Sequence, residues 1–173
     1  MSILNPEHLL EQAERLVVPP PAGPPRQVDI RRAISSAYYS LFHSTLIAAA
    51  DTVVGQVHRN TARYALVYRS IDHGALKSTC DIARQAQLPS SHRLYGPDGG
   101  FLPVIKDFAT SALALRGRRL MADYDPMPRF RTADALFAVE TARTALRKWN
   151  QAPADQRSAF VWLLLFRPRD ATR

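Results

Sequence analysis

The sequence is poor in the features that tie a chain to an oxidising compartment or to a membrane. Cys80 is the only cysteine, which excludes an internal disulfide and a cysteine-rich zinc site. The most apolar run, residues 160–166, is far shorter than the roughly 20 apolar residues that span a bilayer. Residues 1–5 lack the basic start and apolar stretch of a signal peptide. We therefore expect a cytoplasmic protein with no membrane partner.

The signatures of many common enzyme classes are also missing. The chain has no glycine-rich phosphate loop, no nucleophile elbow, no paired-histidine zinc motif and no EF-hand pattern. Its histidines show no metal-ligand spacing among themselves; they are His8, His43, His58, His73 and His92. We therefore expect neither a metal ion nor another cofactor.

Lysine is scarce as well, although the chain is strongly basic. The formal net charge is +8, and only Lys77, Lys106 and Lys148 among the 23 basic residues are lysines. Because arginine presents a planar fork that fits phosphate, this excess favours a nucleic acid partner. A second interpretation is that frequent alanine and arginine reflect a GC-rich genome, with the arginines on solvated helix faces.

Apolar residues recur at helical spacing along most of the chain. The expected helices are 6–17, 29–54, 60–83, 102–122 and 132–149, with a last short helix from Pro153 through Trp162. No segment alternates like a strand, and residues 88–100 are rich in glycine and proline, as in a loop. Short connections between amphipathic helices favour antiparallel neighbours. The sequence therefore predicts an all-α, up-and-down antiparallel helical bundle of about five to six helices.

Several residues are candidates for helix ends. Asn5 followed by Pro6 should begin the first helix, Asp29 should cap the second and Asn60 the third, while Gly74 can bend or interrupt the third. Within one domain overall we expect three parts: an N-terminal helix and proline-rich connector (1–28), the bundle (29–150), and a short helix with a basic tail (151–173).

A first polar pattern lies inside the second helix. Arg32, Ser36, Tyr39 and His43 are offset by four, three and four residues, so they share one stripe of the helix. The stripe combines a cation, hydroxyls and an imidazole. It can be part of a catalytic site, or a satisfied polar seam inside the bundle.

A second pattern is the segment 69–73, Arg-Ser-Ile-Asp-His. In a continuous helix, Arg69 and His73 would lie one turn apart, with Asp72 within reach of Arg69. RNA cleavage by its own 2′-hydroxyl needs a proton acceptor, a proton donor and a cation against the charge that develops on phosphorus. Histidine and arginine supply these without a metal ion. The alternative is a surface ion pair beside an ordinary histidine.

Three segments in this order resemble the HEPN superfamily (higher eukaryotes and prokaryotes nucleotide-binding). They are 31–43 (Arg-Arg-Ala-Ile-Ser-Ser-Ala-Tyr-Tyr-Ser-Leu-Phe-His), 69–73, and 119–126 (Arg-Leu-Met-Ala-Asp-Tyr-Asp-Pro). Small bacterial proteins of this superfamily carry a comparable tyrosine-rich second helix and a late arginine followed by Ala-Asp-Tyr. The resemblance extends over about residues 29–149.

The resemblance implies a dimeric helical bundle that cleaves RNA without a metal ion, as a toxin or a phage-defence component. Active members carry an arginine and a histidine separated by four to six residues, and the two copies face each other across the dimer interface. Carried over to this chain, Arg69 would hold the scissile phosphate, His73 would act as general base or acid, and Ser70 would fill the polar position after the arginine. The resemblance also implies an antitoxin protein as a further partner.

The chain departs from the family pattern, because only three residues separate Arg69 from His73. One reading is that His43 and Arg32 complete the site. An alternative function is a non-catalytic dimeric module that binds RNA, a nucleotide or a partner such as a nucleotidyltransferase antitoxin. A third is a structural subunit whose exposed apolar face, at Trp162 and 163–165, is covered by another chain.

Overall fold

The protein folds into an all-helical bundle in a computed structural model that describes residues 4–21 and 23–168. The long helices are α1 (Pro6–Leu16), α2 (Gln27–Val53), α6 (Pro103–Tyr124) and α7 (Thr132–Gln151). The shorter ones are η1 (Gln56–His58), α3 (Ala62–Arg69), α4 (His73–Ala83), α5 (Ser90–Arg93) and α8 (Ala154–Leu165). The described residues contain no strand, so the predicted fold class is confirmed.

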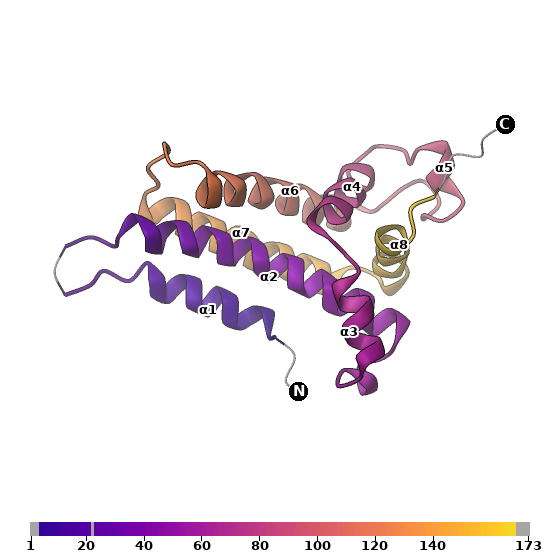
Figure 1. The fold of residues 1–173 in the computed structure, drawn as a ribbon. Helices are drawn as coiled ribbons and strands as arrows, with labels where there is room; N and C mark the ends of the chain where they lie inside the picture. The colour runs from indigo at the N-terminus through magenta and orange to yellow at the C-terminus, as the bar shows by residue number, and fades with distance from the viewer. Residues whose placement is uncertain (1–3, 22, 169–173) are drawn as a thin grey trace.

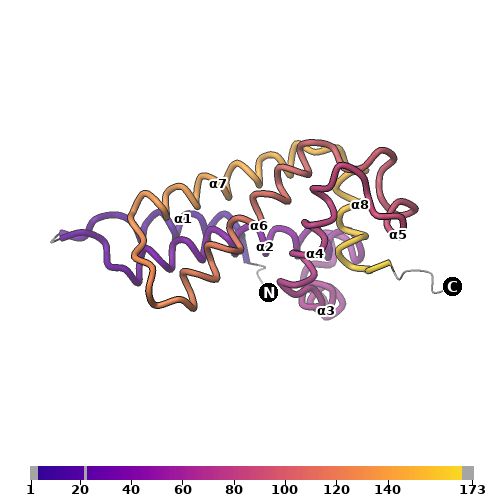
Figure 2. The backbone as a smooth tube through the Cα atoms, turned by 90° about the horizontal axis from the view of Figure 1, so that it is seen from above, coloured from indigo at the N-terminus to yellow at the C-terminus, as the bar shows by residue number. Residues whose placement is uncertain are grey.

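The long helices run side by side in alternating directions, and the short helices gather at one end (Figures 1 and 2). The loops that join α1 to α2 and α6 to α7 both lie at the opposite end. Helix α2 packs against α1, α6, α7, α3 and α8, which makes it the central helix, as its broad apolar surface predicts. No helix of the described residues is both long and apolar enough to cross a bilayer.

Of the three predicted helix caps, one is confirmed and two are displaced. The Asn5 side chain accepts a hydrogen bond from the Glu7 amide, so α1 begins as predicted. Asp29 is wrong as the cap of α2: it lies inside the helix and pairs with the N-cap residue Arg26 at 2.8 Å. Asn60 is wrong as the cap of α3, because the side chain of Thr61 accepts from the Tyr64 amide.

The predicted third helix is two helices, and the predicted loop 88–100 contains a short helix. The break falls at residues 70–72 and not at Gly74, because the Asp72 carboxylate accepts from the Ala75 amide at 2.6 Å and starts α4 there. Helix α5, a single turn, lies between Pro89 and the following glycine-rich segment. The helix count is therefore higher than the predicted five to six. Of the predicted basic tail, residues 169–173 lie outside the described part.

Arg31, near the start of α2, holds the loop between α6 and α7. Its guanidinium donates to the carbonyl oxygens of Ala122 at 2.9 Å, Asp125 at 2.7 Å and Pro128. These carbonyls include the free acceptors at the end of α6, which no helical amide can reach. The contact fixes the end of α6, the helix that carries part of the candidate site.

A cluster of four aromatic rings fills the core where the long and short helices meet. Phe160 of α8 is fully buried, and its ring centroid lies 5.3 Å from that of Trp149, 5.8 Å from Phe108 and 6.1 Å from Phe101. Phe108 and Trp149 pack at 4.8 Å. These contacts join α6, α7 and α8.

Candidate functional site

The two residues of the predicted catalytic pair lie on different helices. Arg69 is the last residue of α3 and His73 the first of α4, so they do not stack one helical turn apart. The exposed Arg69 side chain points back along α3, with Nε donating to the Ala65 carbonyl oxygen at 3.4 Å. The expectation that the two residues share one helical turn is wrong. Helix α3 ends at Arg69, and Asp72 caps the start of a new helix, α4.

His73 instead faces α2. Its Nδ1 lies 2.9 Å from the Tyr38 hydroxyl, in a hydrogen bond. Its ring centroid is 4.1 Å from that of Phe42 and 5.8 Å from that of Tyr39. The half-buried imidazole is therefore held against the aromatic face of the central helix.

His43 lies against the same two rings from within α2. Its ring centroid is 6.1 Å from that of Tyr39 and 5.8 Å from that of Phe42. Its Nδ1 makes a 2.6 Å hydrogen bond with the Tyr68 hydroxyl of α3. Both histidines thus flank one aromatic pair, and each is oriented by a tyrosine through Nδ1, which leaves Nε2 of each ring without a tyrosine partner.

Arg119 of α6 enters the cluster from a fourth helix. It is 8% exposed, and its Nη2 donates to the Tyr39 hydroxyl at 2.6 Å. Its Nε lies 2.7 Å from the Asp123 carboxylate, which also accepts from the Ser35 hydroxyl. Its guanidinium carbon lies 5.2 Å from the centroid of the Tyr124 ring. The charge of Arg119 is therefore balanced by Asp123.

Arg116, one turn earlier on α6, has no such balance. Its Nε is buried and has no hydrogen-bond partner among the described residues. No carboxylate of the described residues forms an ion pair with the Arg116 guanidinium. Its charge helps burial and Arg119 to lower the pKa of His73, and it partly opposes the burial that raises the pKa of Tyr38. Arg116 is therefore a positive charge near His73 that has no ion-pair partner among the described residues.

Both imidazoles have a pKa below the ordinary value of histidine. Burial lowers the pKa of His73 most, the charges of Arg119 and Arg116 lower it further, and Asp72 partly opposes them. Burial also lowers the pKa of His43, and the neighbouring His73 adds to the effect. At neutral pH both rings are therefore mostly uncharged and able to accept a proton.

The lowered pKa values predict a loss of stability in acid. Between the unfolded pKa, near 6.5, and the lower folded values, the unfolded chain binds more protons, so the free energy of unfolding falls as the pH falls. We expect urea unfolding at pH 7 and pH 5 to show this decrease, and a His43→Gln, His73→Gln double variant to show less of it. The exposed His58→Gln variant is the control. An unchanged pH dependence in the double variant would contradict the assignment.

The remaining predicted residues serve local structure. The Ser70 hydroxyl donates to the Val67 carbonyl oxygen at 2.8 Å, and Asp72 caps α4. Arg32 is exposed and lines a shallow hollow with Asp123 and Tyr124, away from the two imidazoles. Of the predicted stripe on α2, Tyr39 and His43 belong to the cluster and Ser36 is buried beside it in the helix. The predicted stripe therefore lies only partly inside the bundle, because its first member, Arg32, is exposed.

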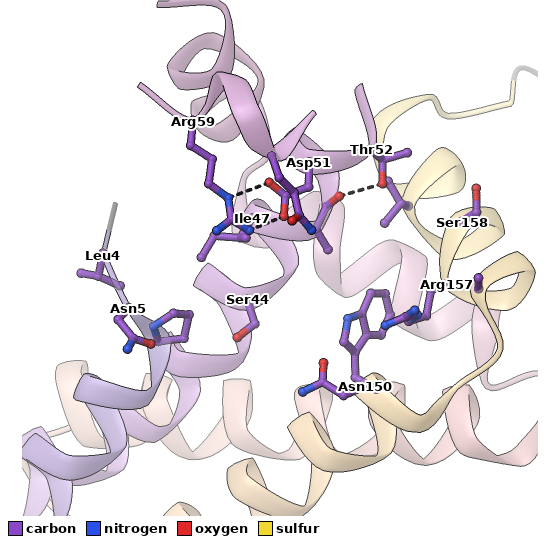
Figure 3. A pocket seen from close by; sticks show the side chains of 16 residues that line it. Leu4, Asn5, Ser44, Ile47, Asp51, Thr52, Arg59, Asn150, Arg157 and Ser158 are labelled. Atoms are coloured by element: carbon purple, nitrogen blue, oxygen red, sulfur yellow. Dashed lines mark hydrogen bonds and ion pairs between the residues drawn. The ribbon is translucent and has the colours of Figure 1, made fainter. Parts of the chain in front are cut away.

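A larger pocket opens on the other side of α2 and contains none of the predicted site residues (Figure 3). Its volume is about 690 Å³, and it lies among the start of α1, the second half of α2, and the junction of α7 with α8. On one wall Asp51 pairs with Arg59 at 2.9 Å and accepts from the Tyr64 hydroxyl at 2.9 Å. These polar groups satisfy one another, so the wall needs no ligand.

Metal-binding and thiol chemistry have little support in the described part of the chain. No group of three or more histidine, cysteine, aspartate or glutamate side chains there is placed to hold a metal ion. Cys80 is fully buried, and burial raises the pKa of its thiol far above the usual range. The chemistry at hand is that of imidazole, phenol and guanidinium groups.

No protein-family model, no curated protein and no solved structure matches the chain.

Proposed function

We propose that the protein is a HEPN-type endoribonuclease that cleaves RNA without requiring a metal ion. The observation that supports it best is the unbalanced charge of Arg116, whose buried Nε lacks a partner among the described residues beside His73. Arg116 is half-buried, and a bound anion would supply the acceptor that its buried Nε lacks. Arginine and histidine together suit a phosphodiester, because one binds the phosphate oxygens and the other moves a proton.

In the proposed reaction, the Nδ1–H group of His73 donates to the Tyr38 hydroxyl oxygen and leaves the lone pair of Nε2 free. Nε2 accepts the proton of the 2′-hydroxyl, whose oxygen forms a bond to phosphorus. The bond from phosphorus to the 5′-oxygen breaks, and that oxygen takes a proton from the minor fraction of His43 that is protonated at neutral pH. The products are a 2′,3′-cyclic phosphate and a 5′-hydroxyl. Arg116 balances the charge on the non-bridging oxygens.

This assignment moves the phosphate-binding role from Arg69 to α6. Arg116 and Arg119 lie close enough to His73 to lower its pKa, whereas Arg69 makes no such contribution. His43 takes the supporting role that the family pattern leaves open. The homodimer, the antitoxin partner and the role as a toxin or phage-defence component stay predictions of the resemblance.

Replacing Arg116 with methionine tests the proposal. We expect kcat/KM for cleavage of an RNA oligonucleotide to fall roughly 100-fold, because one charge that stabilises the transition state is lost. The Arg129→Met variant, which removes an exposed arginine from the α6–α7 loop, is the matched control. A fully 2′-deoxy oligonucleotide should not be cleaved. Equal cleavage by the Arg116→Met variant and the wild type would overturn the assignment.

A second candidate function is a non-catalytic module that binds RNA, a nucleotide or a partner protein. The position of Arg69 favours it, since this side chain is turned onto its own helix. This function predicts oligonucleotide binding that weakens steeply with salt and no appearance of cyclic phosphate with any RNA. Mass spectrometry of the reaction products separates the two functions.

A further inference from the structure

Three exposed aromatic residues line one groove, and the segments that carry them lie at the end of the molecule where α5 and the end of α8 are found (Figures 1 and 2). Tyr95 is 56% exposed, Trp162 44% and Phe166 60%. All three line one apolar groove of about 590 Å³, and the rings of Trp162 and Phe166 stack at 5.6 Å. The predicted apolar face at this helix is thus only partly exposed, because Leu163 and Leu164 are buried.

The groove is bordered by positive charge. Arg167 lines it, whereas Arg93, two residues before Tyr95, donates to the Leu88 carbonyl oxygen at 3.0 Å and lines a different hollow. Within the described ranges, Arg167 forms no ion pair with a carboxylate. A ligand that places flat apolar groups on the rings and negative charge beside Arg167 would complement this surface.

We infer that this groove binds the bases of single-stranded RNA. Every base has a face that stacks on an aromatic ring, and the phosphates between bases are anionic. A protein segment with apolar and acidic side chains has a similar charge pattern, but it does not need three accessible rings. The inference rests on the proposed function for the choice of RNA, and it assigns the substrate strand a second contact away from the reacting phosphate.

Helix α4 connects the groove to the histidine cluster. His73 begins α4, and the Thr79 hydroxyl of the same helix donates to the Leu163 carbonyl oxygen at 3.5 Å. Leu163 lines the groove. Six helical residues span about 9 Å, so a strand of a few nucleotides is long enough to occupy both places. The groove would then hold the strand beside the proposed point of cleavage.

Binding of a fluorescein-labelled 2′-fluoro RNA 12-mer, measured by anisotropy, tests the inference. This strand lacks the attacking hydroxyl, so binding is measured without cleavage. We expect Trp162→Ala and Phe166→Ala each to raise Kd about tenfold, because each removes one stacking ring. Phe137→Ala is the matched control, since Phe137 is also 60% exposed and lies 4.9 Å from the guanidinium carbon of Arg118, but on α7.

The outcomes separate this inference from the proposed function. Unchanged Kd in both groove variants, or equal loss in the Phe137→Ala control, would overturn the groove assignment whatever the protein cleaves. If the wild type does not bind the strand, the assignment also fails and a protein segment becomes the better occupant. If the groove variants bind weakly but the wild type never cleaves the ribose form, the groove assignment stands and the nuclease proposal fails.

Discussion

The His73→Asn variant is expected to lose RNA cleavage by a factor of roughly 10²–10⁴ in kcat/KM, the usual contribution of a general acid or base. Asparagine keeps a polar group that can pair with the Tyr38 hydroxyl, but it cannot accept the proton of the 2′-hydroxyl. The folded structure should therefore persist while the chemical step slows. Single-turnover cleavage of an end-labelled RNA measures the effect.

Two comparisons make this result specific to the site. His58→Asn changes an exposed histidine of η1 and should leave cleavage unchanged. Far-ultraviolet circular dichroism should give the same spectrum for both variants and the wild type. If purified His73→Asn and Arg116→Met proteins both cleave at the wild-type rate, His73 is not the base and the cluster is not the active site.

The Phe160→Ala variant is expected to lower the free energy of unfolding by about 3–5 kcal/mol, as is usual for deletion of a buried aromatic side chain. Phe160 is fully buried and contacts the other three rings of the core cluster. Its removal leaves a cavity that the packed helices can fill only in part. Since a domain of this size is typically stable by about 5–15 kcal/mol, the loss is a large share of the total.

Urea unfolding followed by circular dichroism measures this change. The exposed Phe137→Ala variant has the same change in side chain and should shift stability by no more than about 0.5 kcal/mol. Equal effects of the two substitutions would mean that the four-ring cluster does not stabilise the end of the bundle.

The fold was predictable from the sequence where local chemistry and burial agree. The Asn5–Pro6 cap predicted where α1 begins, and the broad apolar surface of α2 predicted that this helix is central. Both predictions are confirmed. The break between α3 and α4 was misplaced because two signals compete within three residues. Glycine is tolerated in a first helical turn, and an aspartate that can cap a new helix determines where that turn begins.

The candidate site was predictable only in part, because its members come from four helices. The spacing of Tyr39 and His43 on α2 indicated that they lie together, and His73 was singled out for its chemistry. Arg116 and Arg119 approach from α6, about 80 residues along the chain from Tyr39, and no local spacing reports such a contact. The four-residue offset of Arg119 and Asp123 was the one signal that could have identified the ion pair.

The contact between Arg31 and the α6–α7 loop has a consequence for how this protein can diverge. The guanidinium binds main-chain oxygens, which every amino acid carries, so these contacts do not depend on the loop's side chains; within the loop, the Asp125 carboxylate also accepts from the Met127 amide at 3.0 Å. Met127 and Arg129 are exposed and can be exchanged during evolution without moving the loop. A loop of constant shape and variable sequence allows new recognition specificity to arise while the bundle stays intact.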